Sequence, residues 1–314
     1  MEINHSKDKV VSFSQYQQWK QCPHQWYLNY GKGLHKFKPN MYLVFGNAIH
    51  EVIQNYLKIM FDESAAAADR FDNITYFKDK LREGYKSYVK KNKNTHFSDA
   101  AELREFYDDG EAILDFFLKR RRVYFKTRNH QLKGIELPLV GIPNPNRSNI
   151  KFSGYIDIVM YNKNTKMYTI YDIKTSTRGW GDKEKKNKVK SQQILLYKQF
   201  YSKQYKVPME NIEVQFFIVK RKIYENSDFP QKRIQEWSPI KPSFTTKNPG
   251  KNLLRGAIRD FNEFIDDCFT DEGIPIDKDY DKKVSALCGW CPFNDNPELC
   301  DKGLEIQPKF FTFT

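Results

Sequence analysis

The chain has 314 residues, and its 39% hydrophobic content is enough to bury a core in one large domain or two small ones. It contains no stretch that approaches the roughly 20 apolar residues of a membrane span. Residues 1–9 are polar and lack the apolar core of an export signal. We therefore expect a globular, cytoplasmic protein with no membrane partner.

The charge balance is strongly basic. Lysine and arginine total 52 residues against 39 aspartates and glutamates, which gives a net charge of +13, and aromatic residues make up 15% of the chain. This composition suits a polyanionic partner, because cations displace the counterions of phosphates and aromatic rings stack on unpaired bases. Composition alone leaves nucleic-acid binding open, since many basic proteins bind none.

Helical patterns dominate the first part of the chain. Capping signals and apolar spacing predict helices, in chain order, over residues 14–30, 44–61 and 100–125. Ser14 and Gln17 stand in capping-box spacing at the start of the first helix, and Pro23 is expected to bend or interrupt it. The third helix ends in the basic run 119–122, which we interpret as a solvated helix end.

The apolar period then changes to that of strands. Alternation predicts strands, in chain order, over residues 132–140, 152–161, 167–174 and 212–220. Turn residues at 162–165 join the second and third strands into a hairpin. A helix over 188–205 precedes the last strand. After that strand come a long loop with room for one strand (222–251), a helix (253–269) and a cysteine-bearing tail.

This order of elements predicts an α/β fold with a mixed central sheet flanked by helices and with additions at both ends. We divide the chain into an N-terminal helical region (1–130), a core sheet with its helix (131–250) and a C-terminal helix and tail (251–314). All three are expected to form one integrated domain.

Two strands carry side chains that could perform chemistry. Asp172 and Lys174 are two residues apart on one predicted strand, so they share a face. The short hairpin places Asp157 of the preceding strand beside Asp172. Two converging carboxylates suit a hard divalent cation such as Mg²⁺, although a structural ion pair between Asp172 and Lys174 is an alternative interpretation.

Four short motifs occur in a definite order: Gly46 to His50 (GNAIH), Gly154 to Asp157 (GYID), Asp172 to Lys174 (DIK) and Gln193 to Tyr197 (QILLY). This set resembles the motifs of the RecB-like branch of the PD-(D/E)XK nuclease superfamily, which includes the Cas4-like iron–sulfur exonucleases. The resemblance covers roughly residues 12–302 and implies a restriction-endonuclease-like core.

The resemblance also implies roles for single residues. Asp157, Asp172 and His50 would be ligands of Mg²⁺ or Mn²⁺, and Lys174 would position or polarise the attacking water. Gln193 and Tyr197 would support the site and the substrate. Glu136 resembles an acidic position that some relatives hold near the site. Without the resemblance, His50 reads as a helix-surface histidine and Tyr197 as a core residue.

The five cysteines separate into a cluster and a single residue. An odd count without an export signal favours metal ligation or buried thiols over disulfides. Cys268, next to Phe269 on a helix, is interpreted as a small core residue. The resemblance implies that a [4Fe-4S] cluster, which joins the two ends of the chain, is bound by Cys22, Cys288, Cys291 and Cys300. The gap between the last two is longer than in the family pattern, which leaves a structural Zn²⁺ as an alternative.

A basic segment follows the Asp172–Lys174 strand. In the implied fold it lies beside the active site, where its cations could bind the DNA backbone and its tryptophan could stack on a base. The expected contacts are Arg178, Trp180, Lys183, Lys185, Lys186 and Lys188. A solvated, mobile loop is the alternative.

These inferences lead to one functional hypothesis. We expect a Mg²⁺- or Mn²⁺-dependent deoxyribonuclease, namely an exonuclease that acts on single-stranded DNA ends in recombination, repair or replication. The chain has no glycine-rich phosphate loop, so unwinding would require a helicase or recombination partner. A structure-specific or flap endonuclease, and a DNA-binding subunit without catalysis, are the alternatives.

Overall fold

The computed structural model describes residues 3, 7–224, 231–240 and 250–302. The chain divides into two compact units. We call the first the terminal unit (Met1–Lys38, Val140–Gly154 and Gly256–Thr314) and the second the central unit (Pro39–Leu139 and Tyr155–Arg255). None of the helices in the described part of the chain is both long and apolar enough to cross a membrane.

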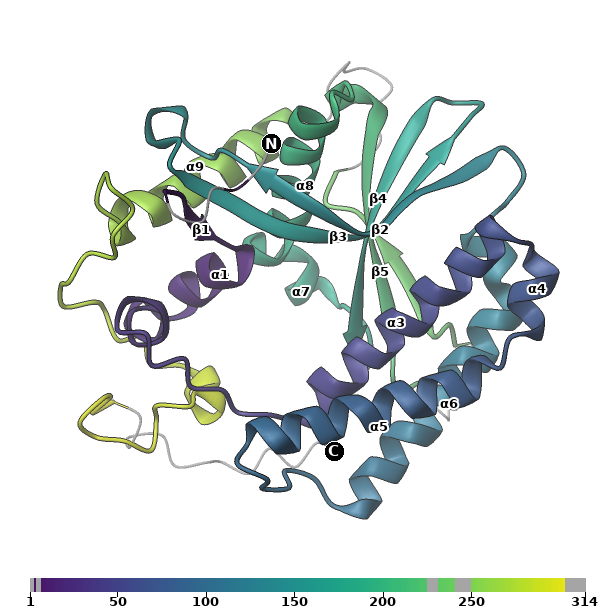
Figure 1. Ribbon diagram of the computed structural model, residues 1–314, viewed down its shortest axis with the longest axis horizontal. Coiled ribbons are helices and arrows are strands. Elements are labelled where there is room, and N and C mark those ends of the chain that lie inside the picture. Colours follow the sequence, from purple (N-terminus) through teal and green to yellow (C-terminus); the bar gives the residue numbers. More distant parts are fainter. Residues whose placement is uncertain (1–2, 4–6, 225–230, 241–249, 303–314) are drawn as a thin grey trace. The chain divides into compact units, whose positions relative to one another are not determined.

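The central unit begins with four helices: α3 (Met41–Asp62), α4 (Ala65–Arg70), α5 (Asn73–Lys91) and α6 (Ala100–Tyr124). The longest of them, α3, α5 and α6, pack on one another (Figure 1). The predictions of α3 and α6 are confirmed, whereas α4 and α5 were missed. The apolar face of α5 is narrow, with Phe77, Leu81 and Tyr85 buried among many charged residues, and this dilutes the periodic signal.

The sheet is mixed, as predicted, and besides β1 (Lys9–Val11) its strands are β2 (His130–Gly141), β3 (Ile150–Asn162), β4 (Met167–Ser176), β5 (Ile212–Lys220) and β6 (Ile234–Trp237). β2 pairs with β3, β3 is antiparallel to β4, β4 is parallel to β5, and β5 is antiparallel to β6 (Figure 1). Within the predicted loop 222–251, β6 is the one described strand, and residues 225–230 and 241–249 lie outside the described residues.

Two α-helices lie between β4 and β5 in the chain. The predicted helix is confirmed as α8 (Lys188–Tyr205), which packs on both strands. A parallel strand pair requires such a crossover connection. The short helix α7 (Asp182–Lys186) was not predicted and replaces part of the expected basic loop. The hairpin turn between β3 and β4 is confirmed, because Asn162 Oδ1 accepts hydrogen bonds from the backbone N–H groups of Asn164 and Thr165.

The terminal unit contains β1 (Lys9–Val11), α1 (Phe13–Gln21), α2 (Pro23–Trp26), a π-helical turn (Tyr27–Gly31) and most of α9 (Lys251–Cys268). β1 pairs in parallel with the first residues of β3. The predicted start of the first helix is wrong: Ser12, not Ser14, is the N-cap, and its Oγ accepts a hydrogen bond from Gln15 N at 3.4 Å. Pro23 interrupts this helix as expected, since it opens α2 after an extended Cys22.

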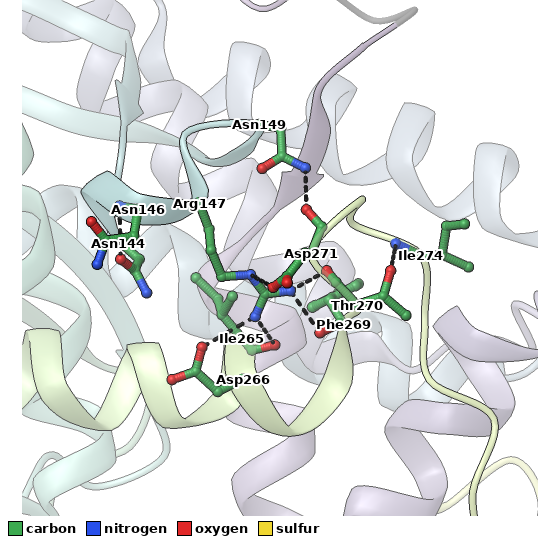
Figure 2. Close-up of polar contacts among 10 residues, drawn as sticks. All are labelled: Asn144, Asn146, Arg147, Asn149, Ile265, Asp266, Phe269, Thr270, Asp271 and Ile274. Carbon is green, nitrogen blue, oxygen red and sulfur yellow. Dashed lines mark hydrogen bonds and ion pairs between the residues drawn. The ribbon is translucent and has the colours of Figure 1, made fainter.

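One arginine of the terminal unit fixes the C-terminal end of α9 (Figure 2). The Arg147 guanidinium donates to the carbonyl oxygens of Ile265 at 3.3 Å, Phe269 at 2.6 Å and Thr270, and it pairs with Asp266 at 3.1 Å. The last carbonyl groups of a helix have no partner within the helix and carry partial negative charge. Ile265 O also accepts from the backbone N–H of Phe269 at 3.0 Å, and Thr270 O from that of Gly273 at 2.9 Å, so Arg147 adds a charged donor to carbonyl groups at the end of α9 and just after it.

Candidate active site

The two carboxylates and the lysine predicted from the sequence meet at β3 and β4. Ile158 of β3 pairs with Tyr171 of β4, and Asp157 directly precedes Ile158 while Asp172 directly follows Tyr171, so the two carboxylates lie next to this pair. Lys174 Nζ lies 2.8 Å from Asp172 Oδ2. Asp157 Oδ2 accepts a hydrogen bond from the backbone N–H of Ile173 at 2.6 Å, which holds this carboxylate against β4.

The histidine of the first motif reaches the same place from α3. His50 Nδ1 lies 3.6 Å from Asp157 Oδ2. Gly46 stands one turn earlier, and a Cβ atom there would lie 3.2 Å from Thr175 Oγ1 of β4, closer than an ordinary contact. The glycine of this motif therefore allows α3 to approach β4 closely enough to present His50 to the carboxylates.

Burial and mutual charge interactions set the charge states of the four site residues. It raises the pKa of Asp157 and of Asp172 to about 6, and the nearby Lys174 charge opposes both shifts. Burial and the Lys174 charge lower the pKa of His50 to about 4. Burial also disfavours the charge of Lys174, but its two carboxylate neighbours outweigh this and raise its pKa. At neutral pH the site therefore holds two carboxylates, one ammonium and a neutral imidazole, a net negative charge.

A glutamine that the sequence analysis did not single out links the site to β2. Gln54 is buried on α3, and its Nε2 donates to Glu136 Oε1 at 2.6 Å and to the backbone oxygen of Asp157 at 3.2 Å. Glu136 has φ of +47°, an unfavourable conformation for a residue with a side chain. Gln54 lies four residues after His50, so helical spacing from the first motif was the available signal.

The fourth motif lies on α8. Gln193 Nε2 donates to Tyr197 Oη at 3.1 Å, and Tyr197 is buried. Burial first, and then the charges of Asp172 and Asp157, raise the pKa of Tyr197. Helix α8 thus places a neutral tyrosine close to the carboxylates. Gln193, which is half-buried, holds the tyrosine hydroxyl.

The carboxylates, lysine and histidine follow the order of the nuclease motifs along the chain. Comparison with family models gives a match to the PD-(D/E)XK nuclease superfamily over residues 10–296. The chain belongs to this superfamily. Comparison with curated proteins gives no match. Membership in the PD-(D/E)XK superfamily implies a metal-dependent nuclease, and therefore a hydrolase with DNA as its substrate.

The residues of this PD-(D/E)XK site fit a hard divalent cation. Asp172 Oδ2 is buried, and the Lys174 ammonium forms an ion pair with it at 2.8 Å. Two buried carboxylates, Asp157 and Asp172, share this one ammonium, so the site keeps a negative charge that is costly to bury and that a divalent cation would offset. The Asp157 carboxylate and the neutral imidazole of His50 offer further metal ligands. As the side chains are placed, no group of three or more His, Cys, Asp and Glu residues within the described ranges is arranged to hold a metal ion.

The predicted DNA-contacting residues follow β4. Arg178, Lys183 and Lys186 are exposed, as is Lys188, whereas Lys185 is half-buried. Trp180 is only 7% exposed. Its ring packs against Phe216 and Trp237, with Lys190 Nζ 5.0 Å from the ring centre. These neighbours cover the Trp180 ring. Base stacking by Trp180 therefore stays a prediction, and it would require the segment after β4 to move away from them.

The cysteines lie in the terminal unit. The predicted ligands Cys22, Cys288, Cys291 and Cys300 line one pocket. Burial raises the pKa of the Cys291 thiol, and the three other cysteines of the pocket raise it further. All five cysteines are free thiols. Cys268 is fully buried on α9, which confirms its interpretation as a core residue.

Proposed function

We propose that this nuclease is an exonuclease that acts on single-stranded DNA ends, in recombination, repair or replication, with Mg²⁺ or Mn²⁺ as its cofactor. The observation that carries the proposal is the convergence of Asp157, Asp172 and Lys174 on adjacent strands. Its central contact is the ion pair of Lys174 Nζ with the buried Asp172 Oδ2 at 2.8 Å, beside the second buried carboxylate of Asp157. A DNA-binding subunit without catalysis has no physical need for this costly arrangement.

The charges of the site explain why a cation is needed. Two carboxylates and one ammonium leave a net negative charge, which repels a DNA phosphate. In our proposal Asp157, Asp172 and His50 hold the divalent cation. When bound, it would lower the pKa of a water molecule and stabilise negative charge on the phosphate, which removes several kcal/mol from the barrier.

Lys174 and the α8 pair act around this centre. The carboxylate neighbours of Lys174 raise its pKa, so without a bound cation the side chain is an ammonium that donates. In our proposal it positions or polarises the attacking water. Gln193 and Tyr197 support the carboxylates and the substrate strand. The cations Arg178, Lys183, Lys185, Lys186 and Lys188 are proposed to bind the DNA backbone next to the site.

We assign a separate, structural role to the four cysteines of the terminal unit. The pocket that they line also contains the apolar side chains of Leu28 and Phe293. Four thiols in one pocket support a [4Fe-4S] cluster, and Zn²⁺ accepts the same donor set. Such a metal group would join the two ends of the chain, and its binding energy would add to the stability of the fold.

A labelled-DNA panel tests the proposed activity. Linear single strands carrying a label at either end, the matching duplexes, and a circular single strand are incubated with Mg²⁺, Mn²⁺ or EDTA. We expect metal-dependent release of short labelled products from one end of the linear single strand, and no cleavage of the circle. Cleavage of the circle would show an endonuclease. No cleavage of any substrate with either metal would support the subunit without catalysis.

A further inference from the structure

The central unit has a second basic site beside the catalytic residues. A pocket of about 810 Å³ lies between α6, the segment after β4, and strands β5 and β6. We call it the α6–β6 pocket. Its cations are Arg120, Arg178, Lys220 and Lys232, and Glu236 is the one carboxylate among its described lining residues.

These cations are available to a ligand. Among the described residues none of the four is within ion-pair distance of a carboxylate, and the nearby carboxylate of Glu236 interacts with Lys232 at longer range. The Arg120 guanidinium lies 4.5 Å from the ring centre of Phe116, and that of Arg178 lies 5.3 Å from the ring centre of Tyr224. An arginine that rests on an aromatic ring leaves its N–H edge open to a phosphate.

The pocket is built into the fold. The backbone N–H of Trp180 donates to Gln235 Oε1 at 2.8 Å, and Gln235 Nε2 donates to Trp180 O at 3.0 Å. Gly179 has φ of +92°, and a Cβ atom there would lie 2.7 Å from Lys220 Cδ and 2.9 Å from Gln235 Oε1. The segment after β4 is thus tied to β6, and it passes so closely that only glycine fits at position 179.

The pocket adjoins the catalytic centre. Trp180 forms one of its walls, and Lys190 lies 5.0 Å from the centre of that ring. Lys220 of the pocket pairs in register with Ser176 of β4, two residues after Lys174, so Lys174 and Lys220 lie on the same face of the sheet. A strand whose scissile phosphate lies at Lys174 can therefore continue past Trp180 into this pocket.

We propose that the α6–β6 pocket binds the unpaired DNA strand next to the scissile phosphate, which makes it a determinant of single-strand preference; this rests on the proposed function. Its cations bind phosphates, and Tyr124 and Tyr224 offer rings for an unpaired base. The volume falls in the range of about 300–1,000 Å³ that is usual for small-molecule sites. A pocket of this size accepts unpaired nucleotides but not a duplex.

Binding of fluorescent oligothymidylate and of a duplex is measured by anisotropy in EDTA, on an Asp172→Ala background. We expect Arg120→Gln and Lys232→Gln each to weaken single-strand binding about fivefold and to reduce the slope of log affinity against log salt by about 0.7. Duplex binding should change less than about twofold. The matched control is Lys119→Gln, which removes the cation next to Arg120 on α6. Lys119 does not line the pocket, and it is paired with Asp115 at 2.8 Å.

The melting temperatures of Arg120→Gln and Lys232→Gln are compared with that of the parent. This comparison separates a loss of binding from a loss of folding. Unchanged single-strand affinity in both variants, or an equal loss for single strand and duplex, would overturn the proposal. So would a loss in Lys119→Gln as large as in Arg120→Gln. These results would leave the nuclease assignment intact, because that assignment fails only if the parent chain cleaves no DNA with either metal.

Discussion

Gln54 and Glu136, which are 82 residues apart in the chain, meet at the back of the catalytic centre. Gln54 Nε2 donates to Glu136 Oε1 at 2.6 Å, and the same nitrogen donates to the backbone oxygen of Asp157 at 3.2 Å. One buried amide thus holds both an acidic residue in a left-handed conformation and the strand that carries a proposed metal ligand. Residues behind a metal site that orient its ligands affect metal affinity strongly.

Gln54→Met should therefore raise the Mn²⁺ concentration that gives half-maximal cleavage by about 10-fold or more. The physical reason is that Glu136 and the Asp157 backbone lose their shared donor. Mn²⁺ titration of the cleavage rate measures the effect. Glu51→Gln, on the exposed face of α3, is the control. If the Mn²⁺ requirement is the same in parent and Gln54→Met, the positioning role is wrong.

Asp172→Asn and Lys174→Met should each reduce cleavage by about 100-fold or more, because both remove charge from the reacting centre. Loss of one partner of a buried ion pair also destabilises a fold. The rate is therefore expressed per folded molecule, determined from a melting curve. Lys163→Met, in the turn at the far end of the β3–β4 hairpin, should cleave like the parent. Near-normal turnover of either site variant would contradict the site assignment.

The cysteine pocket makes a spectroscopic prediction. Protein purified without oxygen should be brown and contain iron and sulfide, and Cys291→Ser should lose both. Its melting temperature should fall, because the metal group joins distant segments of the terminal unit. Cys268→Ala should retain the iron, since Cys268 does not line the pocket. Colourless protein with about one zinc per chain would favour the zinc alternative, and protein without any metal would refute both.

Arg147→Met should lower the free energy of unfolding by about 2–4 kcal/mol, because it removes a charged donor from the carbonyl groups of Ile265, Phe269 and Thr270 at the end of α9 and just after it. Arg147→Lys should lose less, since an ammonium keeps the charge but makes fewer of these bonds. Denaturant titration measures all three proteins. Arg128→Met, at an exposed position, is the control. Equal stability of Arg147→Met and the parent would refute this capping role.

Lys198 should make stability depend on pH. The side chain is buried on α8, its Nζ donates to Ile212 O at 2.7 Å, and burial lowers its pKa to about 8 from 10.5. Between these values the unfolded chain binds more protons, so the free energy of unfolding rises with pH. From about pH 7 to about pH 9.5 the parent should gain about 1–2 kcal/mol relative to Lys198→Met. Parallel pH profiles of the two proteins would refute the assignment.

The sequence by itself determined the parts of the site that depend on local periodicity. Asp172 and Lys174 share a face because alternate residues of a strand always do. Turn residues at 162–165 fixed the hairpin that brings Asp157 beside them, and the helix with the fourth motif was predicted with its observed bounds. A family match over residues 10–296 agrees with the order of these motifs.

Only the tertiary structure decided the features that depend on distant residues. The contact of Gln54 with Glu136, the burial of Trp180 by Phe216 and Trp237, and the position of Arg147 at the end of α9 leave no periodic trace in the chain. From the sequence, the basic run 119–122 at the end of α6 is interpreted as a solvated helix end. The tertiary structure shows that Arg120 of this run lines a pocket together with residues of β6. Local patterns report which face of an element is apolar, whereas packing across the fold decides which side chains meet there.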